Sequence, residues 1–322
     1  MNISGALGIL GGLALFLYGM ELMSEGLQES AGNKLEYVIK KLTDHKIKAV
    51  FVGMLMTCLI QSSSALTVML IGFLNAKIID LKRAIWVVMG ANIGTTITGQ
   101  MIALNIGMIA PILAIIGVIM IVFLSSRFFV HLGKIIGGIG ILFMGLEFMA
   151  VSLSPLQNSA TFLNFMTSLS QPYLAILAGA IFTAIIQSSS AALGILQTLA
   201  KQGLLHFEIG AYMIFGLNIG TCITAVLASL LGCQNAKKLT LFHILFNIAG
   251  TVIFVAICQM TPFLSLIASL TPHAYMNQLA NLHTLFNVIT VLIVLCVDQY
   301  FIDLDVYKRQ GLHFCFLFIN YS

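Results

Sequence analysis

The sequence is poor in charge. Only 8% of its 322 residues are Asp, Glu, Lys or Arg, whereas 59% are hydrophobic and the mean hydropathy is +1.04. A soluble domain carries about 25% charged residues, so this chain cannot build a water-exposed surface. The composition excludes a soluble enzyme, a nucleic-acid-binding module and a disordered chain, and it predicts a polytopic membrane protein in contact with a lipid bilayer.

Paired cysteines and a cleavable leader are also lacking. The six cysteines form no CxxC pair, and five of them lie in apolar runs or at their ends. This pattern predicts neither a metal cluster nor a disulfide framework, and each cysteine is expected to be a small buried hydrophobe. Residues 1–20 have no basic segment and no small-residue cleavage site, so we interpret them as the first span.

The chain repeats itself at an offset of 126 residues. Gly53–Ser64 (GMLMTCLIQSSS) and Gly179–Ser190 (GAIFTAIIQSSS) share seven of twelve residues. Gly90–Thr98 (GANIGTTIT) and Gly216–Thr224 (GLNIGTCIT) share seven of nine at the same offset, without a gap. A fixed self-similarity of this kind indicates two copies of one structural unit.

The apolar runs predict seven membrane crossings in the whole chain and one re-entrant hairpin in each repeat. The first QSSS lies near the middle of the 28 residues between Lys48 and Lys77, with about twelve apolar residues on each side. Twelve residues are too few to cross a bilayer, which needs about 17–25, but they suit one arm of a re-entrant hairpin. The predicted crossings are residues 5–27, 84–105, 108–126, 135–152, 210–231, 239–258 and 278–297.

This topology places 14 of the 15 Lys and Arg residues on one side, with Lys201 the exception, as the positive-inside rule requires. Three crossings plus a hairpin make an odd number, so the second copy is inverted. The predicted fold is an all-α polytopic membrane protein with two inverted repeats, 1–126 and 127–258, each of three membrane-spanning helices plus a re-entrant helical hairpin. Residues 259–303 are expected to form a loop and one extra C-terminal span, and 304–322 match no repeat and are interpreted as a truncation or assembly scar. Inverted repeats with broken elements are typical of secondary transporters.

The two QSSS tetrapeptides are the main candidate site. An unpartnered hydroxyl in an apolar medium costs on the order of 1–3 kcal/mol, so three serines behind a glutamine, present in both copies, favour a binding role over packing. Freed N–H groups at helix N-termini favour anions, and the hydroxyl and carbonyl oxygens can ligate Na⁺. The candidates are Gln61, Ser62, Ser63, Ser64, Gln187, Ser188, Ser189 and Ser190.

The two NIGT segments form a second candidate set. Gly94 and Gly220 permit either unwinding of the helix or close approach of two backbones. Unwinding would bring further polar groups to the interface between the repeats. The candidates are Asn92, Thr95, Thr96, Asn218 and Thr221.

Other polar residues inside apolar runs are weaker candidates. Glu21 and Glu147 occupy equivalent repeat positions, and either a functional role or snorkelling to the interface accounts for them. Two HxxFN boxes lie forty residues apart. For their histidines, His243 and His283, we favour hydrogen bonds in helix packing. Their asparagines, Asn247 and Asn287, are candidate cavity residues. Under the predicted topology no Lys or Arg lies at mid-membrane, so a bound anion needs co-bound cations, and Na⁺ at the same oxygen ligands is expected.

These motifs resemble the type II sodium–phosphate cotransporter family over about residues 5–297: two QSSS motifs, each followed about thirty residues later by NIGT, with the LFLYGMELM and ILFMGLEFM segments and the HxxFN boxes. The resemblance implies sodium-driven import of inorganic phosphate by alternating access, in a multi-pass protein of the cell membrane with no cofactor beyond Na⁺ as the coupling ion. It implies that the QSSS regions bind substrate and sodium, with the NIGT residues nearby. Bacterial relatives often continue into a helical domain resembling PhoU, for which this chain has no residues. Homodimer formation is left open.

Three alternative functions remain. Hydroxyl and backbone donors do not select phosphate uniquely, so symport of another oxyanion is one. An intramembrane serine hydrolase is disfavoured, because no GxSxG surrounds the serines and a duplicated nucleophile has no catalytic reason. A non-transporting scaffold accounts for the hydrophobicity but not for the polar hairpins. We therefore expect a transporter and not an enzyme.

Overall fold

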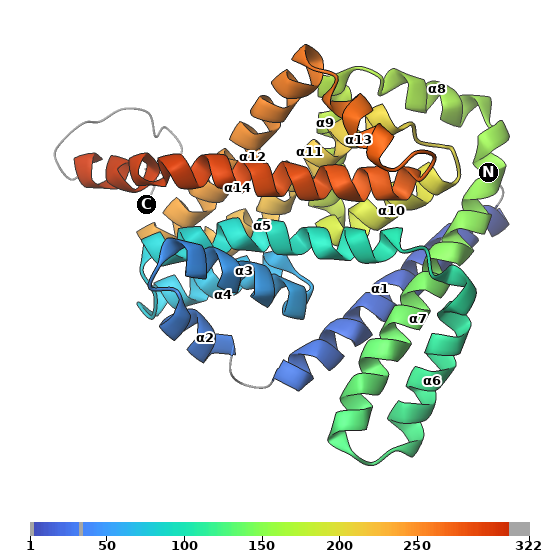
Figure 1. Ribbon diagram of the computed structural model, residues 1–322, viewed down its shortest axis with the longest axis horizontal. Helices are drawn as coiled ribbons and strands as arrows, with labels where there is room; N and C mark the ends of the chain where they lie inside the picture. The colour runs from blue at the N-terminus through green and yellow to red at the C-terminus, as the bar shows by residue number, and fades with distance from the viewer. Residues whose placement is uncertain (1–2, 32–34, 309–322) are drawn as a thin grey trace.

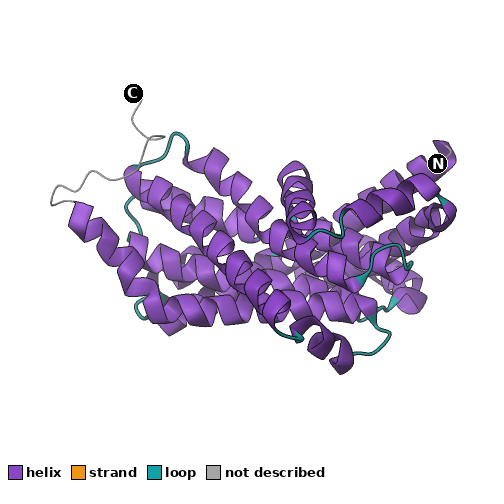
Figure 2. Cartoon of the chain, turned by 90° about the horizontal axis from the view of Figure 1, so that it is seen from above, coloured by secondary structure: helices purple, strands orange, loops and turns teal. Residues whose placement is uncertain are grey.

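The computed structural model describes residues 3–31 and 35–308, and all regular structure in these ranges is helical (Figures 1 and 2). Two short 3-10 segments, Gly107–Ile109 and Ser154–Asn158, lie between helices. Of the tail 304–322, residues 304–308 continue the last helix, and 309–322 lie outside the described residues. The α-helices are α1 (Ile3–Ala31), α2 (Leu35–Leu42), α3 (Lys46–Ile60), α4 (Ser63–Asn75), α5 (Leu81–Ala103), α6 (Ala110–Phe123), α7 (Arg127–Leu153), α8 (Ala160–Ser168), α9 (Pro172–Ile186), α10 (Ser189–Lys201), α11 (Phe207–Ser229), α12 (Gln234–Met260), α13 (Phe263–Leu270) and α14 (Tyr275–Lys308).

The helices are those of an integral membrane protein. Five stretches, in α1, α7, α11, α12 and α14, are long and apolar enough to cross a bilayer. Two bent pairs bring the number to seven if each is one span: α5 with the segment Gly107–Phe123, bent by 73°, and α8 with α9, bent by 108°. These seven differ from the predicted seven. The predicted crossings 84–105 and 108–126 fall in one bent pair, in which α6 has only 14 residues, and the pair of α8 and α9 includes the first arm of the second predicted hairpin. Only Ala110 and Gly117 of α6 are buried, so its apolar surface is available to lipid.

The repeat is visible in the helix boundaries. Adding 126 to the bounds of α3, α4 and α5 gives the bounds of α9, α10 and α11. The same close packing also recurs: a Cβ on Gly53 of α3 would meet the carbonyl oxygen of Val87, and one on Gly179 of α9 would meet that of Met213. Each first hairpin arm thus packs at backbone distance on the long helix that follows. The opposite orientation of the two copies in a membrane stays a prediction.

Glycine contacts also hold α1, α7 and α6 together. Gly19 of α1 faces the backbone of Gly138 and Leu142 on α7, and Gly117 of α6 faces Gly137 on the same helix. These three helices form the arm at the lower right of Figure 1, while α14 runs alongside α5. The arm brings one face of α1 against the end of α3, and this contact completes the site.

Candidate functional site

Each QSSS tetrapeptide interrupts a helix. Gln61 ends α3 and Gln187 ends α9 in the left-handed conformation, with φ of 57° and 60°. The hydroxyls of Ser62 and Ser188 then accept a hydrogen bond from the backbone N–H three residues on, at 3.1 and 3.2 Å, and so cap α4 and α10. A left-handed residue other than glycine costs about 1–2 kcal/mol, and strain of this kind is concentrated at functional sites. The helix breaks predicted at both tetrapeptides are therefore present.

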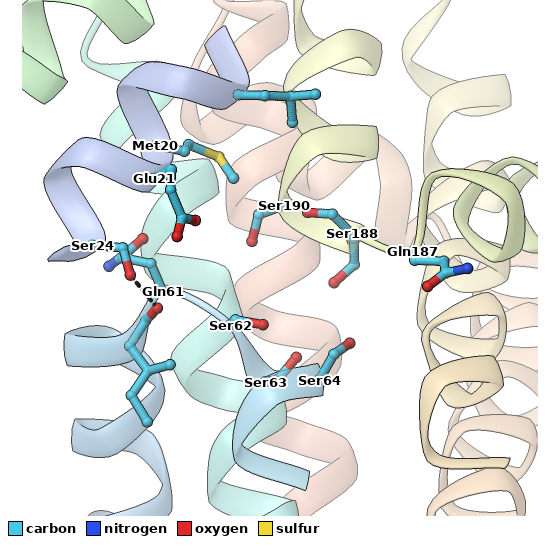
Figure 3. A pocket seen from close by; sticks show the side chains of 13 residues that line it. Met20, Glu21, Ser24, Gln61, Ser62, Ser63, Ser64, Gln187, Ser188 and Ser190 are labelled. Atoms are coloured by element: carbon cyan, nitrogen blue, oxygen red, sulfur yellow. Dashed lines mark hydrogen bonds between the residues drawn. The ribbon is translucent and has the colours of Figure 1, made fainter. Parts of the chain in front are cut away.

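The two tips meet at one cavity (Figure 3). Its volume is about 380 Å³, whereas a single water needs only about 10–15 Å³ of such space. All eight predicted QSSS residues line it, together with one face of α1 and the end of α3. The lining residues are Leu17, Met20, Glu21, Ser24, Ile60, Gln61, Ser62, Ser63, Ser64, Gln187, Ser188, Ser189 and Ser190.

The six serines have two kinds of surroundings. Ser62 and Ser188 are occupied as helix caps, and the Ser190 hydroxyl donates to Thr98 Oγ1 at 3.5 Å. The hydroxyls of the other three, Ser63, Ser64 and Ser189, make no hydrogen bond within the described chain, although Ser63 and Ser189 are buried. These three hydroxyls are free to bind a ligand in the cavity.

The two glutamines differ. Gln61 is only 9% exposed; its Nε2 donates to the carbonyl oxygen of Cys58 at 2.6 Å, and its Oε1 accepts from Thr98 Oγ1 at 2.8 Å. Gln187 is exposed, and Figure 3 shows its amide pointing away from the serines. The first tip is thus held by its glutamine, and the second is not.

Thr98 supports the two tips from behind the cavity lining, and the sequence reasoning missed it. From α5 it bonds both to Gln61 of the first tip and to Ser190 of the second, so it links the two tetrapeptides. Its position as the last residue of the GANIGTTIT match was the available signal. The equivalent Thr224 bonds instead to the carbonyl oxygen of Thr221 on its own helix, at 3.1 Å.

The NIGT segments do not unwind. Both α5 and α11 continue through them, and the close-approach alternative is the one that the structure shows: a Cβ on Gly94 would meet Thr57, and one on Gly220 would meet Thr183. None of the five candidates lines the cavity. Side chains of four bond to carbonyl oxygens of their own helix, namely Asn92, Thr95, Thr96 and Thr221.

The fifth candidate, Asn218, belongs to a buried network with the HxxFN boxes. Asn218 Nδ2 donates to Asn287 Oδ1 at 3.3 Å, and His283 Nε2 lies 3.3 Å from Asn218 Oδ1. In each box the asparagine Nδ2 donates to the carbonyl oxygen of its own histidine, Asn247 to His243 at 3.1 Å and Asn287 to His283 at 2.8 Å. Asn247 Nδ2 also donates to Cys222 Sγ on α11 at 3.2 Å, so the network joins α11, α12 and α14; none of these residues lines the cavity.

The two equivalent carboxylates, Glu21 and Glu147, are placed differently. Glu21 lines the cavity, whereas Glu147 Oε2 lies 2.7 Å from Lys201 Nζ, away from the tips. Ser24, one turn after Glu21, is a second residue that the sequence reasoning missed: its hydroxyl donates to the carbonyl oxygen of Ile60 at 2.6 Å. This bond ties α1 to the first tip.

Two interrupted helices whose tips share a polar cavity inside a bundle of membrane-spanning helices are the arrangement of a membrane transporter. Comparison with known families agrees. The chain belongs to the Na⁺/Pi-cotransporter family, whose profile matches residues 15–151 and 155–296. The family predicted from the motifs is confirmed.

Three relatives illustrate the range of the family. The chain is 33% identical over 293 residues to uncharacterized protein YqeW of Bacillus subtilis (strain 168), covering 90% of this chain and 93% of that protein. It is 27% identical over 261 residues to putative inorganic phosphate export protein YjbB of Escherichia coli (strain K12), covering 81% of this chain but only 47% of the relative. Sodium-dependent phosphate transport protein 2A of Rattus norvegicus is 31% identical over 98 residues, 30% of this chain and 15% of that protein. No solved structure matches the chain.

Proposed function

We propose that this protein is a secondary active transporter of the cell membrane that couples the movement of inorganic phosphate to Na⁺ by alternating access. The observation that carries the proposal is the single cavity lined by both QSSS tips. Membership of the family supports phosphate as the substrate, and the relative named as a sodium-dependent phosphate transport protein supports the coupling ion.

Phosphate would bind at the N-termini of α4 and α10. Both helices begin at the cavity, and each N-terminus carries a partial positive charge of about one half. The unbonded hydroxyls of Ser63, Ser64 and Ser189 add neutral donors for the phosphate oxygens. Two helix termini offset only part of a dianion.

Sodium would supply the missing positive charge. The lining residues include no Lys, Arg or His, so no basic side chain neutralises an anion in this cavity. Unlike unit charges 4 Å apart attract by about 4 kcal/mol at an effective dielectric constant of about 20, so a co-bound Na⁺ strengthens phosphate binding considerably. The tips offer hydroxyl, amide and carbonyl oxygens, the ligands that a hard cation prefers. Each bound Na⁺ brings the loaded site closer to neutral, which lowers the cost of moving it through the membrane.

The direction of net transport follows from the gradients. A symporter runs toward import or export according to the combined driving force, which accommodates the relative named as a phosphate export protein.

Catalysis by the serines is not proposed, because no lining residue can act as the histidine base of a serine hydrolase. Another oxyanion remains the alternative substrate, since the donors are not specific to phosphate.

Ion-substituted radiophosphate flux in proteoliposomes tests the proposal. Uptake should require Na⁺ and fail in K⁺ or choline at fixed pH, and the Ser63→Ala and Ser189→Ala variants should lower it, because each removes an unbonded donor. Ser168→Ala is the matched control, since Ser168 lies exposed on α8 and bonds only to the Phe165 carbonyl oxygen. Uptake that is equal in all three salts would refute the coupling, and inhibition by sulfate stronger than that by unlabelled phosphate would favour the other oxyanion.

A further inference from the structure

Equivalent carboxylates of the two repeats have unequal surroundings. Glu147 forms an ion pair with Lys201, and the space beside this pair is only about 10 Å³. Glu21 instead lines the cavity of about 380 Å³, and Figure 3 shows its carboxylate projecting from α1 into the space bordered by Ser62 and Ser190. In the second repeat the carboxylate is thus paired with a lysine of the same repeat, whereas in the first repeat it faces the cavity at the serine tips.

Glu21 has no fixed counter-charge in the described chain. The residue equivalent to Lys201 in the first repeat is the neutral Asn75, whose Oδ1 accepts the backbone N–H of Cys233 at 2.8 Å. Glu21 itself forms no ion pair and no hydrogen bond with any described residue.

The described basic side chains of α7 that contact α1, Lys134 and His131, are already engaged; His131 Nε2 lies 3.5 Å from Glu29 Oε2. Lys134 Nζ lies 3.3 Å from Glu25 Oε2 and 2.7 Å from Glu29 Oε1, one and two turns beyond Glu21. No described residue therefore supplies a positive partner for Glu21, and a bound cation can take that place.

The partner must also be exchangeable. A carboxylate in the cavity that receives phosphate repels it, because the lining supplies no positive side chain between them. A cation bound to Glu21 removes this repulsion, and its release restores it. The carboxylate thereby makes anion binding depend on prior cation binding.

We infer that Glu21 is a ligand of the coupling Na⁺, held between its carboxylate and the oxygens of the QSSS tips. This inference rests on the proposed sodium-coupled transport and names the one charged ligand of its cation. Glu147 takes no part, because Lys201 occupies it.

Two measurements on the purified full-length protein test this assignment: phosphate uptake against Na⁺ concentration at fixed pH, and thermal stabilisation by NaCl against choline chloride without phosphate. In Glu21→Gln the Na⁺ concentration for half-maximal uptake should rise at least tenfold, and the Na⁺-specific thermal shift should disappear. Glu21→Asp, which keeps the carboxylate, should retain the shift. Glu147→Gln, the matched control from the second repeat, should respond to Na⁺ as the unaltered protein does.

The outcomes separate this inference from the proposed function. Uptake by the unaltered protein that ignores Na⁺ would refute the coupling itself. Sodium-driven uptake with unchanged half-saturation and thermal shift in Glu21→Gln would overturn only the role of Glu21, and leave it as a carboxylate at the membrane interface. A response to pH in place of Na⁺ that disappears in Glu21→Gln would assign the carboxylate to a proton and overturn the sodium assignment. A choline-chloride unfolding midpoint equal to that of the unaltered protein shows that the variant is folded.

Discussion

Replacement of Thr98 by valine tests whether the link between the two tips positions the site. Valine has nearly the shape of threonine but lacks the hydroxyl, so both bonds of Thr98 are lost while the packing of α5 is kept. The bond to Gln61 Oε1 is 2.8 Å long and buried, whereas the contact with Ser190 is 3.5 Å and at the limit of a hydrogen bond. The first bond therefore carries most of the effect.

The magnitude follows from the burial of Gln61. Leaving a buried acceptor without its partner costs about 1–3 kcal/mol. Gln61 lines the cavity, where water can replace part of the lost bond to Oε1, so we expect the lower part of that range. If phosphate binding is weakened by about 1–2 kcal/mol, the affinity for phosphate falls by a factor of about 5–30. We expect the phosphate concentration for half-maximal uptake to rise by this factor in Thr98→Val.

Sodium-driven radiophosphate uptake measures the effect, and two variants control it. Thr98→Ser keeps the hydroxyl and should remain close to the unaltered protein. Thr224→Val removes the equivalent hydroxyl of the second repeat, which bonds only to its own helix, and should change half-saturation less than twofold. An unaltered half-saturation in Thr98→Val, or an equal loss in Thr224→Val, would refute the positioning role.

Two further predictions concern the packing and the topology of the first repeat. Gly53→Ala should destabilise the protein by about 1–3 kcal/mol or more, because the added methyl group meets the Val87 carbonyl oxygen. Gly72→Ala is the control and should not destabilise it, because its methyl group meets nothing within 4 Å. Thermal unfolding in detergent compares the two variants, and equal midpoints would contradict the close packing. In a cysteine-free background, Lys48→Cys and Lys77→Cys should react with an impermeant maleimide from the same side of sealed vesicles, because α3 and α4 form a hairpin broken at Ser62. Labelling from opposite sides would show that this segment crosses the membrane.

Local chemistry made much of the architecture predictable. Serine is a preferred helix cap, and Ser62 and Ser188 act as caps where the sequence predicted the breaks. The offset of 126 residues predicted corresponding helices because equal local sequences favour equal local structure, and α3 to α5 recur as α9 to α11. The NIGT segments show the limit of this reasoning: Gly94 and Gly220 allow either unwinding or packing, and the hairpin arms packed against them decide in favour of packing.

The sequence by itself determined the class of protein, the family, the duplication and the eight tip residues, because composition, repeats and capping depend on neighbours along the chain. Only the tertiary structure decided which other polar side chains reach the cavity or hold its tips in place. Thr98 bonds to residues 37 and 92 positions away, and the two equivalent carboxylates differ because α1 lies against the first tip while Glu147 meets Lys201. Such contacts arise from helix packing through glycine faces, which brings together residues that no local pattern connects.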